Sequence, residues 1–293
     1  MQSWRNLSLV GTQMKVNPLV ITASGALGLT LLTACSSGTT PQTHSASATH
    51  ASALGSPSHA ASPIQSRSTP ASVAATNAKL ITDAIASGSA SMMSSVGSSA
   101  AGPVMEAYIQ FQALQDEASA AQGFSNQSDS VTQIPGGYQL CEPEGSSNLC
   151  TSFTGFRSDT SGRITDFQSD GQLISSRIAA GSDSAGSGLA ISNVTSFLFG
   201  GTGTLYVTFD ARDLSWHPVN TDPPFISLFI TSSGSRFSYD VSQSTIPTSL
   251  EPGQSAAVIL VFHANVNTGQ LSLTENDSAP DNLIVSTTLH KIG

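Results

Sequence analysis

Charged residues are scarce in this chain, and basic residues are scarcer still. Only 10% of the 293 residues are Asp, Glu, Lys or Arg, and 10 basic residues against 19 acidic ones give a net charge of −9. The basic residues are scattered, whereas a nucleic-acid-binding surface needs them gathered in a patch or stripe. An acidic surface also repels the phosphate backbone. The composition therefore excludes a nucleic-acid partner.

Signatures of known catalytic sites are missing as well. The chain has no GxSxG, HExxH, SxxK or GxxxxGK sequence, so the serine-hydrolase, zinc-protease, penicillin-binding and P-loop classes find no support. His217, His263 and His290 and the many serines do not make a triad by abundance, because a triad is defined by its geometry. We therefore predict no catalytic residue, no cofactor and no metal site.

Cysteine is rare, and the first of the three stands in a distinctive setting. Leu32-Thr33-Ala34-Cys35 closes an uncharged stretch over residues 16–34 that follows Arg5 and Lys15. A positive head, an apolar segment and small residues are typical of a secretory signal. The order resembles the bacterial lipobox, which implies that residues 1–34 are a lipoprotein signal peptide. It also implies that lipids on Cys35 hold the chain at the extracytoplasmic face of the cell membrane.

Two alternatives to lipidation stay open. A simple signal peptide could be cut after Ala34, or the apolar stretch could be an uncleaved membrane helix. A spanning helix needs roughly 20 predominantly apolar residues, and this stretch contains Asn17, Pro18 and several threonines. We favour the lipoprotein interpretation because it also accounts for Cys35.

The other two cysteines are even in number, as expected of disulfide partners in an oxidising compartment. Cys141 and Cys150 flank a turn-rich segment between two strand-like stretches, which predicts a disulfide across the neck of a hairpin. A redox-active pair is the alternative, but the spacing is not that of a CxxC motif.

Residues 35–75 consist largely of Ser, Thr, Ala and Pro. Such a segment has too few large apolar side chains to offset the entropy of ordering, so we predict a disordered tether. His44, His50 and His59 are irregularly spaced, which favours a solvated linker over a metal site.

Residues 76–180 are predicted to form a small α+β module with one disulfide. A weak helix is expected over residues 76–96, and a better one begins at Gly102-Pro103 and ends at Gly123. Tyr108 and Phe111 lie on the apolar face of that second helix. Short strands bounded by turn residues are expected at 131–134, 137–141, 151–156, 163–167 and 172–178.

After a Gly- and Ser-rich hinge, residues 187–293 are predicted to form an antiparallel β-sandwich. The seven expected strands cover residues 189–199, 205–211, 225–230, 237–241, 256–263, 270–273 and 283–290. Seven such segments with regular turn signals are typical of a sandwich. Residues 256–262 are continuously apolar, which predicts a central strand covered on both faces. The fold class is therefore mostly β, with a small α+β module before the sandwich.

A family resemblance supports the same architecture. Leu250-Glu251-Pro252-Gly253-Gln254 precedes the apolar strand 258–262, with alternating residues 205–209 upstream and 271–273 downstream. This pattern resembles the immunoglobulin-like domain of Gram-positive secreted lipoproteins, of DUF4352-like or MPT63-like type. The resemblance covers about residues 187–293. It implies an extracytoplasmic interaction module without assigned chemistry.

Two polar segments are candidate sites. A Pro-rich loop carries Asp213, Trp216, His217 and Asp222. A Trp face on a sandwich loop could meet a sugar ring or a peptide. The alternative, which we favour from the sequence, is that Trp216 folds back over the sandwich edge. A second segment with Glu275, Asp277 and Asp281, and Glu142 with Glu144 in the disulfide loop, match no calcium-binding spacing and are expected to be solvated turns.

The function predicted is that of a cell-surface lipoprotein that binds an envelope protein or a glycan, or has a structural role in the envelope, without catalysis. It would contact the membrane through Cys35. The alternatives are an envelope hydrolase that acts on glycan or ester through residues 76–180, and a lipoprotein that captures a substrate for a transporter.

Overall fold

The structure, a computed structural model, describes residues 69–123, 128–141, 150–186, 188–200, 203–216, 218–220, 226–274 and 284–293. Three helices open this described part of the chain. Cys35, the signal segment and nearly all of the predicted tether lie outside these residues. The described residues fall in one compact unit that includes Ser68–Gly293. None of their helices combines the length and apolar character needed to cross a membrane.

The first helix, α1 (Pro70–Ser87), begins inside the segment predicted as tether. Thr69 caps it, because its side-chain oxygen accepts a hydrogen bond from the Ser72 amide and Pro70 occupies the first turn, where no amide donor is needed. Gly88 ends it in the left-handed conformation, with φ of 60°. A short helix, α2 (Ala90–Ser95), and a 3₁₀ turn, η1 (Val96–Ser99), follow.

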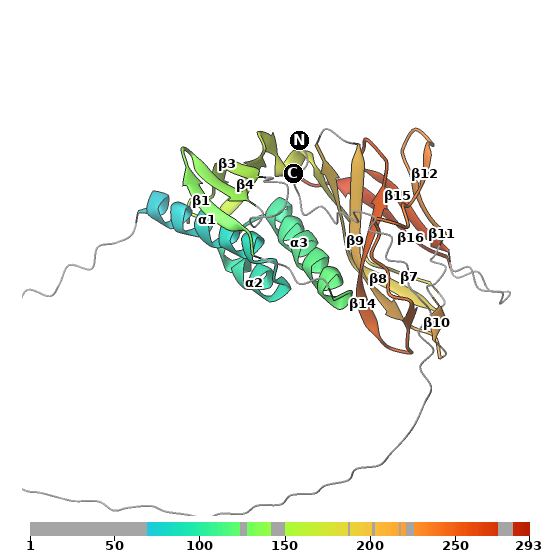
Figure 1. Ribbon diagram of the computed structural model, residues 1–293. Coiled ribbons are helices and arrows are strands. Elements are labelled where there is room, and N and C mark those ends of the chain that lie inside the picture. The colour runs from blue at the N-terminus through green and yellow to red at the C-terminus, as the bar shows by residue number, and fades with distance from the viewer. Residues whose placement is uncertain are drawn as a thin grey trace, which may run out of the picture. The chain divides into compact units, whose positions relative to one another are not determined.

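Helix α3 (Pro103–Ala121) starts where the Gly102-Pro103 signal predicts. Only one apolar face was expected, but the helix is buried around most of its circumference. Polar residues Gln112, Gln115 and Asp116 are buried along with the apolar ones. The reason is that α3 packs against α2 on one side and against β8, β9 and β14 of the large sheet on another (Figure 1).

A five-stranded antiparallel sheet follows in chain order. It comprises β1 (Ser130–Ile134), β2 (Gly137–Cys141), β3 (Cys150–Ser158), β4 (Ile164–Ser169) and β5 (Gln172–Leu173). Cys141 and Cys150 lie opposite each other in the β2–β3 register and are joined by the predicted disulfide. The strand expected over residues 172–178 is instead β5, a 3₁₀ turn η2 (Ile174–Ser176) and the start of the next strand, which belongs to another sheet.

That second sheet has nine strands among the described residues. In spatial order they are β12 (Arg236–Ser238), β11 (Ile226–Ile230), β15 (Gly269–Thr274), β16 (Ile284–Lys291), β6 (Ile178–Gly181), β8 (Leu189–Phe199), β9 (Thr204–Asp213) and β14 (Ser255–Phe262), with β7 (Ser184–Ala185) on β8. A small pair of strands, β10 (Val219–Asn220) and β13 (Ser249–Leu250), accompanies it.

The large sheet nearly closes on itself. Beyond β12, Tyr239 forms an antiparallel bridge with Phe262, and Thr245 forms another with Ile259. The chain that leaves one edge strand therefore lies along the other edge, β14. The fold class predicted from the sequence is confirmed: the protein is mostly β, with a small helical module followed by antiparallel sheets that form a sandwich approaching a barrel.

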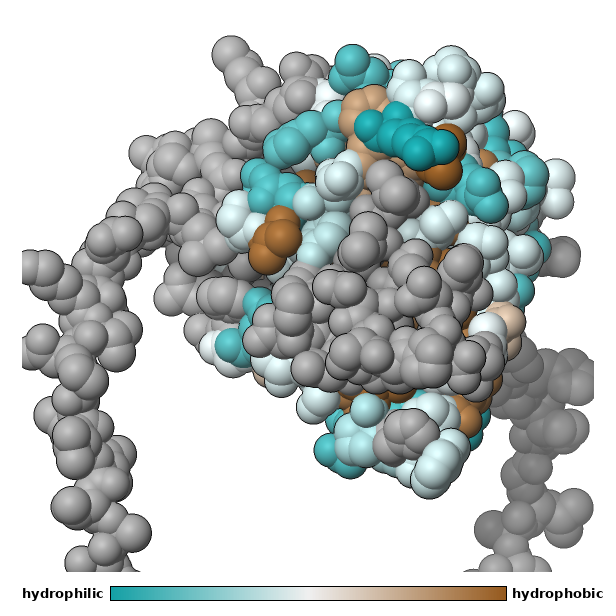
Figure 2. Space-filling model, turned by 90° about the vertical axis from the view of Figure 1, so that its right-hand side faces the viewer, coloured by the Kyte–Doolittle hydropathy of each residue, from teal (hydrophilic) through white to brown (hydrophobic). Residues whose placement is uncertain are grey.

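The apolar run of β14 is covered on both faces, as predicted. Val258, Leu260 and Phe262 belong to the core of the sandwich, whereas Ile259 and Val261 pack with Leu114 and Ala118 of α3. The strand is not central, however, because it stands at the end of the sheet order. On the face shown in Figure 2, the described surface is mostly hydrophilic or neutral, with small separate hydrophobic areas, as expected when apolar side chains point inward.

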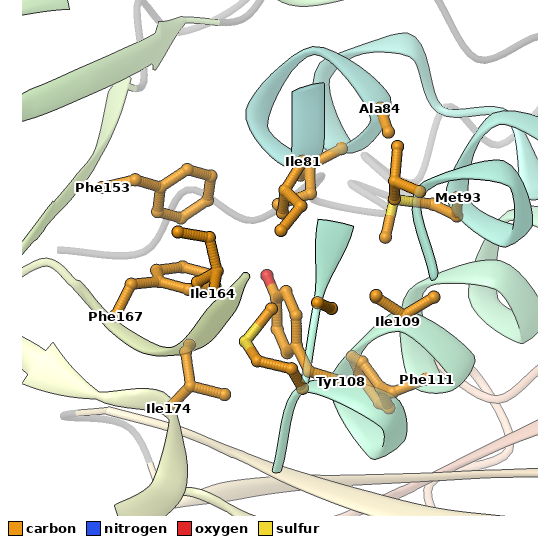
Figure 3. Close-up of a cluster of buried hydrophobic side chains, with 14 of the residues drawn as sticks. Ile81, Ala84, Met93, Tyr108, Ile109, Phe111, Phe153, Ile164, Phe167 and Ile174 are labelled. Atoms are coloured by element: carbon orange, nitrogen blue, oxygen red, sulfur yellow. The ribbon is translucent and has the colours of Figure 1, made fainter. Parts of the chain in front are cut away.

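A second core surrounds Tyr108 of α3 (Figure 3). Its ring makes an edge-to-face contact with Phe167 of β4, with ring centroids 5.3 Å apart. Phe111 packs on Phe197 of β8, also at 5.3 Å. Because Phe197 belongs to the large sheet, this core joins the helices, the small sheet and the sandwich.

Candidate functional site

The residues predicted as a partner-binding loop begin at the end of β9. Asp213 is the last residue of that strand and is fully buried. Its Oδ1 accepts the Ser215 amide at 2.6 Å, its own amide donates to the Gln254 carbonyl, and its carbonyl accepts the Gly253 amide, both at 3.0 Å. Asp213 therefore fixes the turn and connects it to the turn before β14.

The second carboxylate oxygen of Asp213, Oδ2, is buried and has no hydrogen-bond partner in the described chain. An unsatisfied buried acceptor costs about 1–3 kcal/mol. The three hydrogen bonds that surround it on the same residue offset that cost. We conclude that the side chain serves the local backbone geometry and is not exposed to a partner.

Trp216 lies three residues beyond Asp213 and does not fold back over the sandwich edge. Its side chain is 87% exposed, and neighbouring Leu214 is 46% exposed. The backbone of this turn is fixed to the segment before β8, because the Leu214 amide donates to the Gly188 carbonyl at 2.8 Å. His217 and Asp222 lie outside the described residues, so the structure places only Asp213 and Trp216 of the predicted loop.

The acidic segments of the sequence also fall outside the described residues: Glu142, Glu144, Glu275, Asp277 and Asp281. Where the chain is described, no group of three or more His, Cys, Asp or Glu side chains is placed to hold a metal ion.

A histidine and a serine do gather around one carboxylate. The His263 Nε2 atom lies 3.1 Å from Asp240 Oδ2, and the Ser242 hydroxyl donates to Asp240 Oδ1 at 2.6 Å. These contacts, led by the Ser242 hydrogen bond, lower the pKa of the Asp240 carboxyl. A hydrolytic triad needs the histidine between the serine and the acid. Here both contact the acid, so the arrangement secures the turn after β12 to the end of β14.

Arg177 is a buried cation that links the two sheets. Its Nε donates to the Leu198 carbonyl at 2.8 Å, and its guanidinium carbon lies 4.5 Å from the centre of the Phe197 ring. Burial lowers the pKa of this guanidinium. Within the described chain it forms no ion pair with a carboxylate, so carbonyl dipoles, the aromatic face and the more distant charge of Asp170 stabilise its charge.

A groove that was not predicted from the sequence lies beside α3. It has a volume of about 540 Å³ and is lined by Ser94, Gly97, Glu106, Ile109, Gln110, Ala113, Leu114, Glu117 and Asn193. Two glutamates eleven residues apart, and so on the same face of the helix, were the available signal. The contribution of Asn193 had no such signal, because it depends on the pairing of β8 with β9.

Asn193 sits at an irregularity of β8. The register between β8 and β9 shifts between Ser192 and Thr195, and Asn193 adopts a positive φ of 59°, which Asn tolerates better than most residues. Its backbone amide donates to Asp183 Oδ1 at 3.1 Å, and its side-chain Nδ2 donates to Asp210 Oδ2 at 2.7 Å. The bulge thereby places the Asn193 side chain, fixed by these hydrogen bonds, in the lining of the groove.

Comparison of the chain with protein-family models, with curated proteins and with solved structures finds no match.

Proposed function

We propose that this chain is a lipid-anchored protein of the extracytoplasmic face of the cell membrane, and that its folded part binds an envelope protein or a glycan. The order of the segment that ends in Leu32-Thr33-Ala34-Cys35 supports the anchor. Acyl chains on Cys35 would provide the two or more lipid groups that stable anchoring requires. The Cys141–Cys150 disulfide fits an oxidising compartment outside the cytoplasm.

One observation carries the binding role: Trp216 stands 87% exposed on a turn whose backbone Asp213 fixes. A large aromatic side chain that is mostly exposed offers apolar area that a partner can bury. Tryptophan is also enriched among the residues that dominate binding energies. Because the turn is held by hydrogen bonds, little ordering of its backbone would be needed on binding.

The groove along α3 favours a second candidate, a lipoprotein that captures a small substrate for a transporter. Its volume of about 540 Å³ lies in the usual range for small-molecule sites. The hydrolase alternative gains no comparable support, because Ser242 and His263 both contact the Asp240 carboxylate, whereas a triad places the histidine between the serine and the acid.

Photo-crosslinking in intact cells of the producing organism tests the binding role. The wild type is compared with Trp216→Ala and with Val241→Ala, a matched control in which another exposed apolar side chain, 64% exposed, is truncated. We expect one envelope component to crosslink to the wild type and to the control, and to be lost from Trp216→Ala. Equal crosslinking by all three proteins would contradict a site at Trp216.

The anchor is tested separately by metabolic labelling with a radioactive fatty acid. Label is expected in the wild-type protein and absent from Cys35→Ala, which should also accumulate unprocessed. Labelling that survives in Cys35→Ala would refute the lipobox assignment.

A further inference from the structure

The groove beside α3 runs along one stripe of that helix. Glu106, Gln110, Ala113 and Glu117 follow one another at intervals of four, three and four residues, so they share a face. With a rise of 1.5 Å per residue, the two glutamates are separated by about 16 Å along the helix axis. They therefore mark two distant points of one groove and do not form a single acidic cluster.

Between these points the lining combines apolar and neutral polar groups. Ile109, Ala113 and Leu114 contribute the aliphatic part of the surface, and Ser94 and Gln110 add neutral polar groups. None of the lining residues is aromatic, so the groove lacks the flat ring on which a sugar would stack. None is basic, so an anion would meet uncompensated repulsion.

Both glutamates are available to a ligand. Each is exposed, and neither side chain has a hydrogen bond or an ion pair with another described residue. The Asn193 side chain adds a fixed acceptor: its Nδ2 is committed to Asp210, while its Oδ1 accepts no hydrogen bond from the described chain. Asp183 and Asp210, which hold Asn193, add further negative charge near the groove.

We propose that this groove binds a linear aliphatic polycation of the polyamine type. Terminal ammonium groups would pair with Glu106 and Glu117, and the methylene chain would lie over Ile109 and Leu114. Inner ammonium groups would donate to neutral oxygens such as Asn193 Oδ1. An extended peptide fits less well, because its amides would need backbone partners, and the α3 backbone is already hydrogen-bonded within the helix.

This inference goes beyond the proposed function and depends on neither Cys35 nor Trp216. The test is titration calorimetry of spermine against the full-length chain, purified in a non-ionic detergent. We expect one spermine per chain and much weaker binding of the shorter diamine putrescine, which cannot reach both glutamates. Glu106→Gln and Glu117→Gln should each weaken spermine binding about fivefold, as loss of one exposed ion pair predicts.

Glu251→Gln is the matched control, because it removes the same charge from an exposed residue that does not line the groove. It should leave spermine affinity unchanged. If Glu251→Gln weakens binding as much as the groove variants do, spermine is responding to the net charge of −9 and the proposal fails. It fails equally if spermine does not bind.

Gly97→Leu tests the groove by filling it. A Cβ added at Gly97 meets no atom within 4 Å, and Gly97 lines the groove, so we expect the groove to accommodate a leucine side chain at this position. We expect spermine binding to fall at least tenfold while the thermal unfolding temperature stays within a few degrees of the wild type. Unchanged affinity in a folded Gly97→Leu protein would overturn the proposal.

Discussion

Thr195 of β8 and Thr208 of β9 face each other with their hydroxyl oxygens 2.8 Å apart in the interior. Both side chains lie on the face of the sheet that carries Phe197, which packs against Phe111 of α3. The β8–β9 pairing thus places two polar groups under a helix, where each satisfies the other.

Removing one hydroxyl of this pair should be more harmful than removing both. In Thr195→Val the Thr208 hydroxyl loses its partner while buried, and we expect a loss of about 1–3 kcal/mol in the free energy of unfolding. The Thr195→Val/Thr208→Val double variant should lose less than either single variant, and so less than their sum. Urea unfolding of the four proteins measures the coupling. Additive losses would show that the hydroxyls do not interact.

Truncation of a buried aromatic residue should cost far more unfolding free energy than truncation of an exposed one. Phe197→Ala opens a cavity between α3 and the large sheet, and an expected loss of about 3–5 kcal/mol follows. Trp216→Ala removes an exposed side chain, so unfolding should shift by no more than about 0.5 kcal/mol. Urea unfolding monitored by circular dichroism measures both. A large loss in Trp216→Ala would mean that the indole supports the fold, and the crosslinking test would then need another substitution.

The disulfide should add stability by restricting the unfolded chain. Replacing both Cys141 and Cys150 by serine should lower the free energy of unfolding by about 2–3 kcal/mol, as the loop-closure estimate predicts. Denaturant unfolding measures the loss. Mass spectrometry after alkylation without reduction provides the control, because free thiols at both positions of exported protein would show that the bridge does not form.

The turn after β3 should titrate at unusually low pH. Hydrogen bonds from Ser161, with further ones from Arg163, hold the pKa of the Asp159 carboxyl at about 2, below its ordinary 3.8. Since the folded-state pKa is the lower one, this contribution to stability is fully present above pH 3.8 and is lost as the pH falls toward 2. NMR titration should find the low midpoint in the wild type and a higher one in Ser161→Ala. Identical midpoints would show that Ser161 does not lower the pKa.

Features with local causes were predictable from the sequence. The start of α3 follows from Gly102-Pro103, and the Cys141–Cys150 bridge follows from pairing in a hairpin. The strand β8 was expected over the residues that form it, because turn signals bound it on both sides.

Features set by distant partners were not predictable. Turn residues after Ile178 indicated a hinge, but they could not reveal that β6 pairs with β8 and β16. The apolar run of β14 implied cover on both faces but not its place at the end of the sheet. The sequence places Asp213 in a candidate partner-binding loop, whereas the structure buries it and joins it by backbone hydrogen bonds to the turn before β14.

The bridges along β14 also bear on how this chain avoids self-association. Seven consecutive apolar residues in a strand make a sequence that readily stacks with copies of itself into amyloid. The outer edge of β14 is already hydrogen-bonded within the chain, so it cannot pair with another molecule. Ile259 exchanges backbone hydrogen bonds with Thr245. The Val261 carbonyl accepts the Asp240 amide, and the Val261 amide donates to the Ser244 hydroxyl. A serine side chain thus completes a ladder where no backbone carbonyl reaches, and the most aggregation-prone strand of the protein is left without a free edge.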